Sequence, residues 1–338
     1  MLTRYTTRVD ISLETQGIGI EQISYWLPPL VVENSEVAER HGFGEEFVLE
    51  KLGIRQRRVL APDLSVSDMA SRAVNQLFED SESSPEEVEV IILVSQTPDY
   101  LIPHSSAIVQ HNLGIPESAL VFDVSLGCSG FVIGLDVAIS IMERMGMSKG
   151  VLVTADAYSR IVDPADRATA PLFGDAATAT LLSAKPKWKL GNSDFGSRGS
   201  EFDKLILRGS GTTPGSRHPL HMDGRGILNF TRKIVPESVL RALSKNGLTV
   251  DNVDKFVFHQ ANAFVLETIR QILGLPAEKL TKSLEDVGNT TSSSIPIALR
   301  REIFDAGDPA EVVLLSGFGV GLSWSSSVLF RVWEKELK

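Results

Sequence analysis

The chain has 338 residues, of which 43% are hydrophobic and 22% charged, and its formal net charge is -10. That length can bury the core of one large domain or of two ordinary ones. The acidic balance argues against nucleic acid as a partner, and a single cysteine excludes an internal disulfide and a thiolate metal cluster. The sequence contains neither a membrane helix, which needs roughly 20 apolar residues, nor the apolar core of a signal peptide. We therefore expect a cytoplasmic protein that does not enter a membrane.

Along the first half, apolar strands alternate with helices. Residues 88–99, "VEVIILVSQTPD", form a β-branched run that stops at polar residues and proline, as a strand buried on both faces does. The sequence then predicts a helix over 106–116, a strand over 119–125, a helix over 130–146 and a strand over 150–156. Helices that cross between strands imply a parallel or mixed sheet covered on both sides, which is an α/β fold.

The second half repeats this order of elements. It predicts a strand over 253–262, a helix over 263–276, a strand, turn and helix over 280–307, and two strands over 310–333. The run "VEVIILVSQTP" corresponds to "VDKFVFHQAN", and "KGVLVTADAYS" corresponds to "AEVVLLSGFGVG". Such self-similarity predicts a duplicated α/β unit.

A change in composition suggests where the two copies meet. Residues 187–250 are richer in Gly, Pro and charge, and much of this region is predicted as loops around the short strand "KLILR". We therefore expect one half over 1–186 and the other over 187–338.

Cys128, the only thiol, follows the strand over 119–125 and begins the helix over 130–146. The N–H groups at a helix start stabilise a thiolate, which is the nucleophilic form of cysteine. Gly127 and Gly130 permit a tight turn and a close approach of substrate to the backbone. The position thus predicts a nucleophile with a lowered pKa. The alternative is a buried small apolar side chain, which is the usual role of a lone cysteine.

His259 and Asn289 occupy the corresponding strand ends of the second half. Open α/β sheets bind ligands at such ends, although alone a histidine is more often a core residue and an asparagine a turn residue. His218, His221 and Asp223 have a possible metal-ligand spacing, but no other cluster accompanies them, so no metal site is predicted.

Five motifs together resemble one family. They are "GCSGF", "FGDAATATLL", "FHQAN", "GNTTSSSIP" and "GFGVGLSW", and the resemblance runs from about residue 17 to about residue 331. The chain is similar to the β-ketoacyl-acyl-carrier-protein synthase III family of thiolase-like condensing enzymes. The resemblance implies a five-layered αβαβα fold made of two duplicated halves, and a homodimer. It also implies that no metal or organic cofactor is used, with coenzyme A or phosphopantetheine thioesters as substrates.

The resemblance also implies a catalytic triad of Cys128, His259 and Asn289. Cys128 would accept an acyl group, and the backbone N–H groups of Cys128 and Val320 would hold the oxyanion. His259 and Asn289 would then donate hydrogen bonds to the enolate formed when a malonyl thioester loses CO₂. A Claisen condensation would follow, in fatty-acid or specialised acyl-chain biosynthesis. Thiolases, which use a second cysteine, and elongating synthases, which have a second histidine at the position of Asn289, match less well.

Other positions aligned with the family concern substrates and carrier. Phe47 and Lys51 stand where many relatives carry a Trp and an Arg that hold the adenine of coenzyme A, which favours an acyl carrier protein as donor. Phe264 stands where relatives often carry a carrier-binding Arg, so the carrier is assigned instead to Arg232, Lys233 and Arg270. The resemblance further places four residues in the acyl pocket, namely Tyr158, Phe173, Leu205 and Leu220.

Two alternatives to a condensing enzyme stay open from the sequence. One is an acyltransferase of the same fold that passes the Cys-bound acyl group to a hydroxyl or an amine. The other is a partner subunit without activity, which the intact triad argues against.

Overall fold

A ten-stranded mixed sheet runs through the computed structural model, which describes residues 17–42, 44, 48–216 and 218–333. The order of its strands is β12-β13-β14-β8-β1-β7-β6-β4-β5, and β9 pairs with β14. The first half of the chain supplies β1 (Gly19–Trp26), β4 (Val90–Val94), β5 (Leu120–Val124), β6 (Lys149–Asp156) and β7 (Ala176–Ser183). The second half supplies β8 (Trp188–Leu190), β9 (Asp194–Ser197), β12 (Lys255–Phe258), β13 (Val312–Gly319) and β14 (Ser323–Arg331). The short strand β8 joins the two sets, because it pairs with both β1 and β14.

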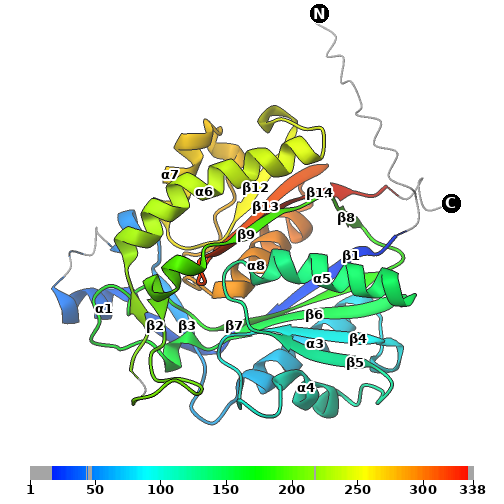
Figure 1. Ribbon diagram of the computed structural model, residues 1–338, viewed down its shortest axis with the longest axis horizontal. Coiled ribbons are helices and arrows are strands. Elements are labelled where there is room, and N and C mark those ends of the chain that lie inside the picture. Colours follow the sequence, from blue (N-terminus) through cyan, green and yellow to red (C-terminus); the bar gives the residue numbers. More distant parts are fainter. Residues whose placement is uncertain (1–16, 43, 45–47, 217, 334–338) are drawn as a thin grey trace, which may run out of the picture.

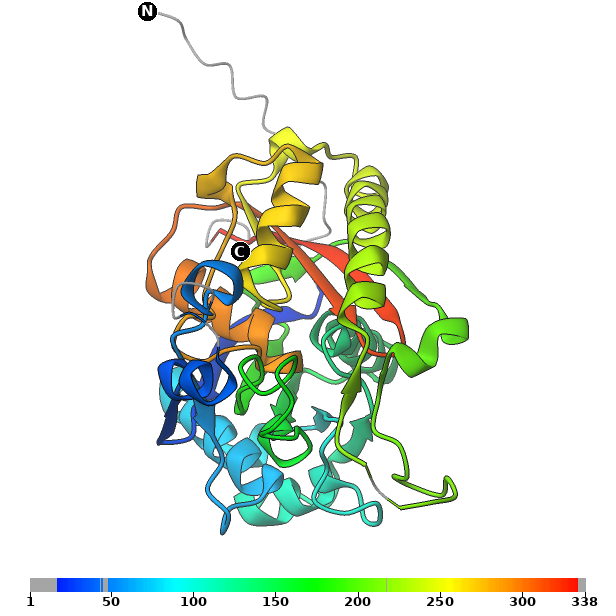
Figure 2. The same cartoon turned by 90° about the vertical axis from the view of Figure 1, so that its left-hand side faces the viewer.

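Six principal helices cover these strands in three layers (Figure 1). Helices α3 (Val66–Ser81) and α4 (Ser105–Leu113) lie outside the first set, α6 (Gly224–Lys245) and α7 (Ala263–Leu273) outside the second, and α5 (Gly130–Met145) and α8 (Ser294–Leu299) between the two. A view turned by 90° shows the same order, with α3 and α4 below and α6 and α7 above (Figure 2). This is the five-layered αβαβα arrangement that the resemblance implies.

The alternation of side chains along the strands builds these layers. In β4, Val90, Ile92 and Val94 face the middle layer, whereas Ile91 and Leu93 pack with α3. Because successive side chains of a strand point to opposite faces, a strand buried on both sides must be apolar throughout. The continuous apolar runs of the sequence therefore mark the strands that lie between two helical layers.

The smaller elements lie at the end of the sheet that also carries the candidate residues Cys128, His259 and Asn289. They are β2 (Leu30–Glu33), α1 (Asn34–His41), η1 (Val48–Leu52), β3 (Gln56–Val59), β10 (Leu205–Ile206) and β11 (His221–Met222). No helix in the described part of the chain combines the length and the apolar character needed to cross a membrane.

One expectation about the elements is wrong, and one helix was not predicted. The strand expected at the start of 280–307 is reduced to a single bridge between Leu280 and Phe256, so the described part of the second half has no counterpart of β5. The region 187–250, much of which was expected to be loops, also contains α6, a 22-residue helix that the sequence did not reveal. Gly224, Gly226 and Pro236 all lie within this helix, and each is a residue type that ordinarily disfavours helix. The proposed boundary at residue 186 lies between β7 and β8.

Candidate active site

Cys128 lies between the end of β5 and the first turn of α5, and it is 5% exposed. The end of β13 packs directly against it. A methyl group added at Gly319 would lie 3.0 Å from the Cys128 sulfur, and one added at Gly317 would lie 2.7 Å from the Cys128 carbonyl oxygen. The two glycines of "GFG" thus allow the second half of the chain to close over the thiol of the first half.

The environment of the sulfur favours a thiol over a thiolate. Burial raises the pKa of Cys128 to about 12, and the nearby Asp156 carboxylate acts in the same direction. The backbone N–H groups of Cys128 and Val320 lie at the sulfur and lower its pKa, but they offset only part of the effect of burial. The lowered pKa expected from the helix start is therefore wrong for the resting protein, because desolvation exceeds the stabilisation by N–H groups. The two N–H groups are those that the sequence assigned to the oxyanion.

His259 directly follows β12 and is buried. Its backbone N–H donates to the Ser316 carbonyl oxygen at 2.8 Å, and its ring meets that of Phe318 edge-on, with 5.6 Å between centroids. The Nδ1 atom lies 2.8 Å from Ser294 Oγ, so Nε2 is the ring nitrogen left for a ligand. Burial lowers the pKa of His259 from 6.5 to about 3, and the backbone of Thr291 opposes the shift. The imidazole is therefore neutral at physiological pH, as an enolate-stabilising donor must be.

Asn289 is buried in the segment between α7 and α8, and it is anchored on the first half of the chain. Its backbone N–H donates to the Leu172 carbonyl oxygen at 2.9 Å, and its own carbonyl accepts from the Gly174 N–H at 3.1 Å. The side-chain Oδ1 accepts from the Thr291 N–H at 3.0 Å. This bond settles which way the amide points, and the Nδ2 hydrogens remain as the donors of the side chain.

The four residues predicted to line the acyl pocket are all buried in the same large hydrophobic core. Tyr158, Phe173, Leu205 and Leu220 all belong to it, and the rings of Tyr158 and Phe173 lie 5.0 Å apart. Tyr158 is close enough to Cys128 for the thiol to contribute to the raised pKa of its phenol, although burial is the main cause.

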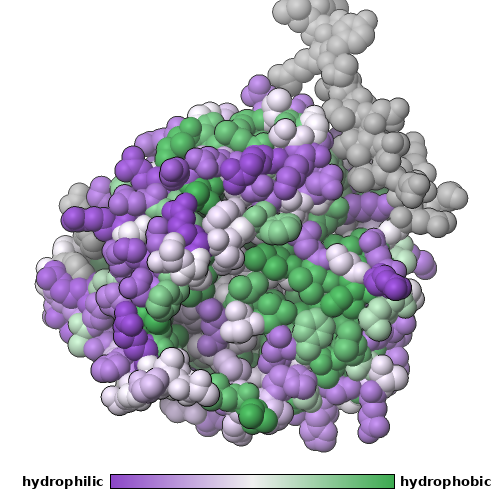
Figure 3. Space-filling model, viewed as in Figure 1, coloured by the Kyte–Doolittle hydropathy of each residue, from purple (hydrophilic) through white to green (hydrophobic). Residues whose placement is uncertain are grey.

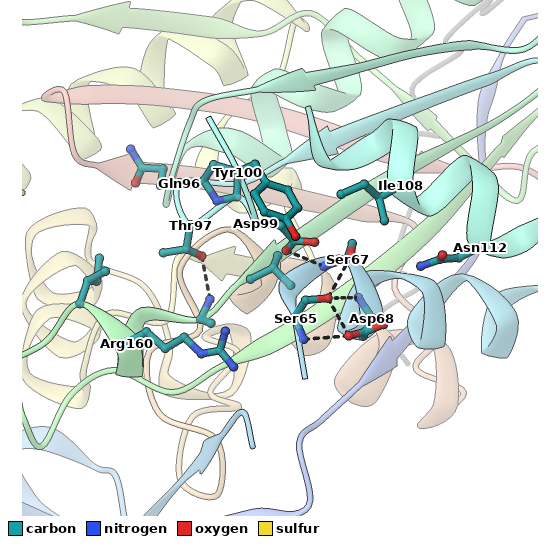
Figure 4. Close-up of a pocket in the computed structure, with 14 residues that line it drawn as sticks. Ser65, Ser67, Asp68, Gln96, Thr97, Asp99, Tyr100, Ile108, Asn112 and Arg160 are labelled. Carbon is teal, nitrogen blue, oxygen red and sulfur yellow. Dashed lines mark hydrogen bonds between the residues drawn. The ribbon is translucent and has the colours of Figure 1, made fainter. Parts of the chain in front are cut away.

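Two polar residues near Cys128 were not predicted from the sequence. The Tyr158 hydroxyl donates to Gln96 Oε1 at 2.7 Å, and this same oxygen lies against Gly127. Gln96 also lines a pocket of about 480 Å³ beside the end of β4, together with Thr97, Tyr100 and other residues (Figure 4). The second residue is Asp156, a fully buried carboxylate at the end of β6. A polar residue at the end of a buried strand, or within two positions after it, was the available signal for both.

The predicted contacts with substrate and carrier lie at the surface. Lys51 is exposed on η1, which packs against α7, while Phe47 lies outside the described residues. Arg232 and Lys233 are exposed on α6, and neither forms an ion pair within the described ranges. Arg270 is different: Glu267 binds its guanidinium in a bidentate pair at 2.6 and 2.9 Å, and the Leu275 carbonyl accepts a further bond at 2.6 Å. Because this cation is already neutralised, it is a weaker candidate than the other two for binding an acidic carrier.

Asp223, one of the three residues with metal-ligand spacing, has another role. Its carboxylate accepts from the Gly226 N–H at 2.9 Å and so caps α6, and it pairs with the Lys204 ammonium at 2.8 Å. No group of three or more His, Cys, Asp and Glu side chains in the described ranges is arranged to hold a metal ion.

Comparison with known proteins identifies the family. Residues 122–199 match the family model "3-oxoacyl-[acyl-carrier-protein] synthase III", and residues 243–331 match the model of its C-terminal part. The β-ketoacyl-[acyl-carrier-protein] synthase III of Caldanaerobacter subterraneus subsp. tengcongensis is 33% identical in an alignment of 336 positions, which covers 95% of this chain and 99% of that protein.

Solved structures agree with this assignment. The crystal structure of a 3-oxoacyl-(acyl-carrier-protein) synthase III has a TM-score of 0.88 at 34% identity, covering 93% of this chain and 99% of that one. The corresponding synthase III of Thermus thermophilus has a TM-score of 0.86 at 33% identity, with the same coverage. The chain therefore belongs to the β-ketoacyl-acyl-carrier-protein synthase III family and is a condensing enzyme of the thiolase-like fold.

Proposed function

We propose that the protein joins an acyl group to a malonyl thioester in two half-reactions, with Cys128 as the carrier of the acyl group. In the first, the Cys128 sulfur attacks the acyl thioester carbonyl, the bond to the donor sulfur breaks, and the donor thiol leaves with the proton of Cys128. In the second, the malonyl thioester loses CO₂ and becomes an enolate. The enolate carbon then attacks the acyl-Cys carbonyl, the bond from this carbonyl carbon to the Cys128 sulfur breaks, and the departing thiolate takes a proton from water to regenerate the thiol.

One observation supports the two proposed half-reactions more than any other: hydrogen-bond donors converge on the thiol from both halves of the chain. The N–H groups of Cys128 and Val320 lie at the sulfur, where the oxyanion of a tetrahedral intermediate would form. Nε2 of the neutral His259 and the Asn289 amide are the proposed donors to the enolate oxygen. Donation from Nε2 requires the Ser294 hydroxyl to turn its hydrogen from the Thr291 carbonyl oxygen to His259 Nδ1. A neutral imidazole suits this step because an imidazolium would be acidic enough to protonate the carbanion.

The proposed substrates are an acyl thioester of a carrier protein or coenzyme A, and a malonyl-carrier thioester. The exposed cations Arg232 and Lys233 are the proposed contacts with an acidic carrier. No organic or metal cofactor enters the proposed steps, because the thioester sulfur is the leaving group and loss of CO₂ supplies the carbanion.

We further propose that two copies associate through the β5 edge of the sheet. Within the described chain β5 ends the sheet, and Leu120, Phe122 and Val124 on it are only partly buried. An apolar patch covers this edge and the adjoining face of α5 (Figure 3). Tyr100, Leu101 and Ile102, in the loop after β4, are 61%, 77% and 88% exposed. A second β5, antiparallel around a twofold axis, would pair the edge and cover the apolar surface.

Half-reaction assays test the proposed chemistry. Intact-protein mass spectrometry after incubation with acyl donors should show one acyl adduct, which Cys128→Ala removes. Asn289→Ala should lower decarboxylation of the malonyl thioester by about 10²–10³-fold, the effect of losing one oxyanion donor, while self-acylation largely survives. An adduct that persists in Cys128→Ala contradicts the covalent step. A wild type that acylates itself but never decarboxylates malonyl thioesters would instead point to an acyltransferase.

Sedimentation of charge variants tests the proposed dimer. Phe122→Asp places a carboxylate at the β5 edge and should shift the protein to monomers, whereas Ile272→Asp, at a 46% exposed site on α7, should not. A dimer that persists in Phe122→Asp would place the interface elsewhere.

A further inference from the structure

We propose that Asp156 is a positioning residue that holds Thr291 in the geometry on which both enolate-stabilising side chains depend. The inference rests on the proposed function, since it concerns the decarboxylation half-reaction. Asp156 ends β6 and is 0% exposed, yet no step of the proposed chemistry uses its carboxylate. A buried carboxylate is retained only where donors replace the water it has lost, so its partners indicate what it does.

One carboxylate oxygen of Asp156 binds the end of β4. The Oδ1 atom accepts from the Gln96 backbone N–H at 2.8 Å, the Thr97 hydroxyl at 3.3 Å and the Ser95 hydroxyl at 3.4 Å. Gln96 in turn contacts Gly127, next to the nucleophile. This oxygen therefore supports the side of the site that carries Cys128.

The other oxygen binds the segment that leads into α8. The Oδ2 atom accepts from the Thr291 hydroxyl at 2.6 Å and from the Ser292 hydroxyl at 2.8 Å. These bonds span 135 and 136 positions of the sequence, and they join the first half of the chain to the second. A single carboxylate thus connects the nucleophile side with the Asn289 side.

Thr291 needs such a restraint. Its φ is +50°, in the left-handed region that β-branched residues rarely adopt. Its hydroxyl lies 2.6 Å from Asp156 Oδ2 and 2.8 Å from the Thr290 carbonyl oxygen, and we assign its hydrogen to the shorter contact with Asp156, which holds the residue in this conformation. The backbone groups of Thr291 are then directed by the same bond.

Both backbone groups of Thr291 act on the site. Its N–H donates to Asn289 Oδ1 at 3.0 Å and so orients the amide. Its carbonyl accepts from Ser294 Oγ at 2.9 Å, and that Oγ lies 2.8 Å from His259 Nδ1. Release of Thr291 would therefore disturb the donor directions of Asn289 and His259 together, while the N–H groups at the Cys128 sulfur would stay in place.

The test separates the two half-reactions in a set of variants. Thr291→Val removes only the hydroxyl that Asp156 binds, Thr291→Ser retains it, and Asp156→Asn removes the charge. Thr180→Val is the matched control, because Thr180 is also a buried threonine and its hydroxyl has no hydrogen-bond partner among the described residues. For each variant we would measure kcat and KM for malonyl-thioester decarboxylation, the rate of self-acylation, and Tm.

We expect Thr291→Val and Asp156→Asn to lower kcat for decarboxylation by at least tenfold, with KM changed less than threefold. Self-acylation should change less than threefold in Thr291→Val, which therefore carries the comparison of the two half-reactions. In Asp156→Asn self-acylation should change as well, because Asp156 also binds the Cys128 side of the site and its charge raises the pKa of Cys128. Thr291→Ser should restore most of kcat, and Thr180→Val should resemble the wild type. Equal losses in both half-reactions, or an unchanged decarboxylation kcat, in folded Thr291→Val would overturn the inference. A purely structural role would lower Tm without separating the two rates.

A crystal structure of Thr291→Val tests the same link without turnover. The distance from the residue 291 N to Asn289 Oδ1 should lengthen from 3.0 Å to beyond hydrogen-bonding range. An unmoved Asn289 would refute the positioning role. A wild type without malonyl decarboxylation would refute the proposed function instead, and the structural result would still decide the role of Asp156.

Discussion

The contact between Gly319 and Cys128 leads to the most specific prediction. The Gly319→Ala change adds one methyl group, which would lie 2.9 Å from Cys128 Cβ and 3.0 Å from Sγ. Ordinary contacts lie at 3.4–4 Å, so Cys128 or the end of β13 must move by at least 0.5 Å, the difference between 2.9 and 3.4 Å. The backbone of Gly319 is outside the left-handed region, so alanine introduces no strain of its own.

The displacement sets the expected magnitude. A misplacement of about 1 Å can lower a rate by about 10²-fold, so a shift of this size should slow self-acylation by roughly 10- to 100-fold. Overpacking should also lower the free energy of unfolding by about 1–3 kcal/mol. Cys128 would still be present, and the N–H of Val320 would move with the strand that carries the added methyl group.

The assay is the rate of acyl-adduct formation, followed by intact-protein mass spectrometry on protein whose folding is checked by Tm. Gly199→Ala is the matched control, because a methyl group there meets no atom within 4 Å. It should acylate at the wild-type rate. Self-acylation of folded Gly319→Ala within threefold of the wild type would refute the reasoning, since it would mean that the nucleophile tolerates displacement.

Three further predictions concern titration and the donor. Alkylation of Cys128 by iodoacetamide should accelerate about tenfold per pH unit from about pH 7 to 10, because its pKa is about 12, and a plateau below about pH 9 would contradict the burial effect. The pKa of His259 falls from 6.5 to about 3 on folding, so its contribution to stability is complete above pH 6.5 and is lost below it. As the pH falls from 6.5 towards 3, the free energy of unfolding should therefore drop by about 1.4 kcal/mol per pH unit because of His259. Urea titrations of His259→Asn should lack this pH-dependent component. Finally, kcat/KM should be higher for acyl-carrier than for acyl-coenzyme A with the same acyl group, and Lys51→Arg should narrow that difference; a preference for coenzyme A that Lys51→Arg leaves unchanged would show that adenine is held another way.

The local pattern of the sequence was sufficient to predict the strands and helices that carry the site. A strand between two helical layers must be apolar on both faces, so the runs around Val90–Val94 and Val312–Gly319 predicted β4 and β13 directly. The glycines beside Cys128 and the repeat of the two halves predicted that Cys128 and His259 occupy strand ends. These features depend on neighbours along the chain, which a sequence shows.

The tertiary structure decided the properties that depend on neighbours through space. The pKa of Cys128 is raised because β13 of the other half covers the thiol and Asp156 lies nearby, and neither effect is visible in "GCSGF". The role proposed for Asp156 likewise depends on donors in two segments that are distant from it along the chain. Helix α6 forms despite its glycines and internal proline because its apolar side packs on β14 and β13. Desolvation, long-range hydrogen bonds and burial are set by folding, so they override local preference and lie beyond what sequence pattern determines.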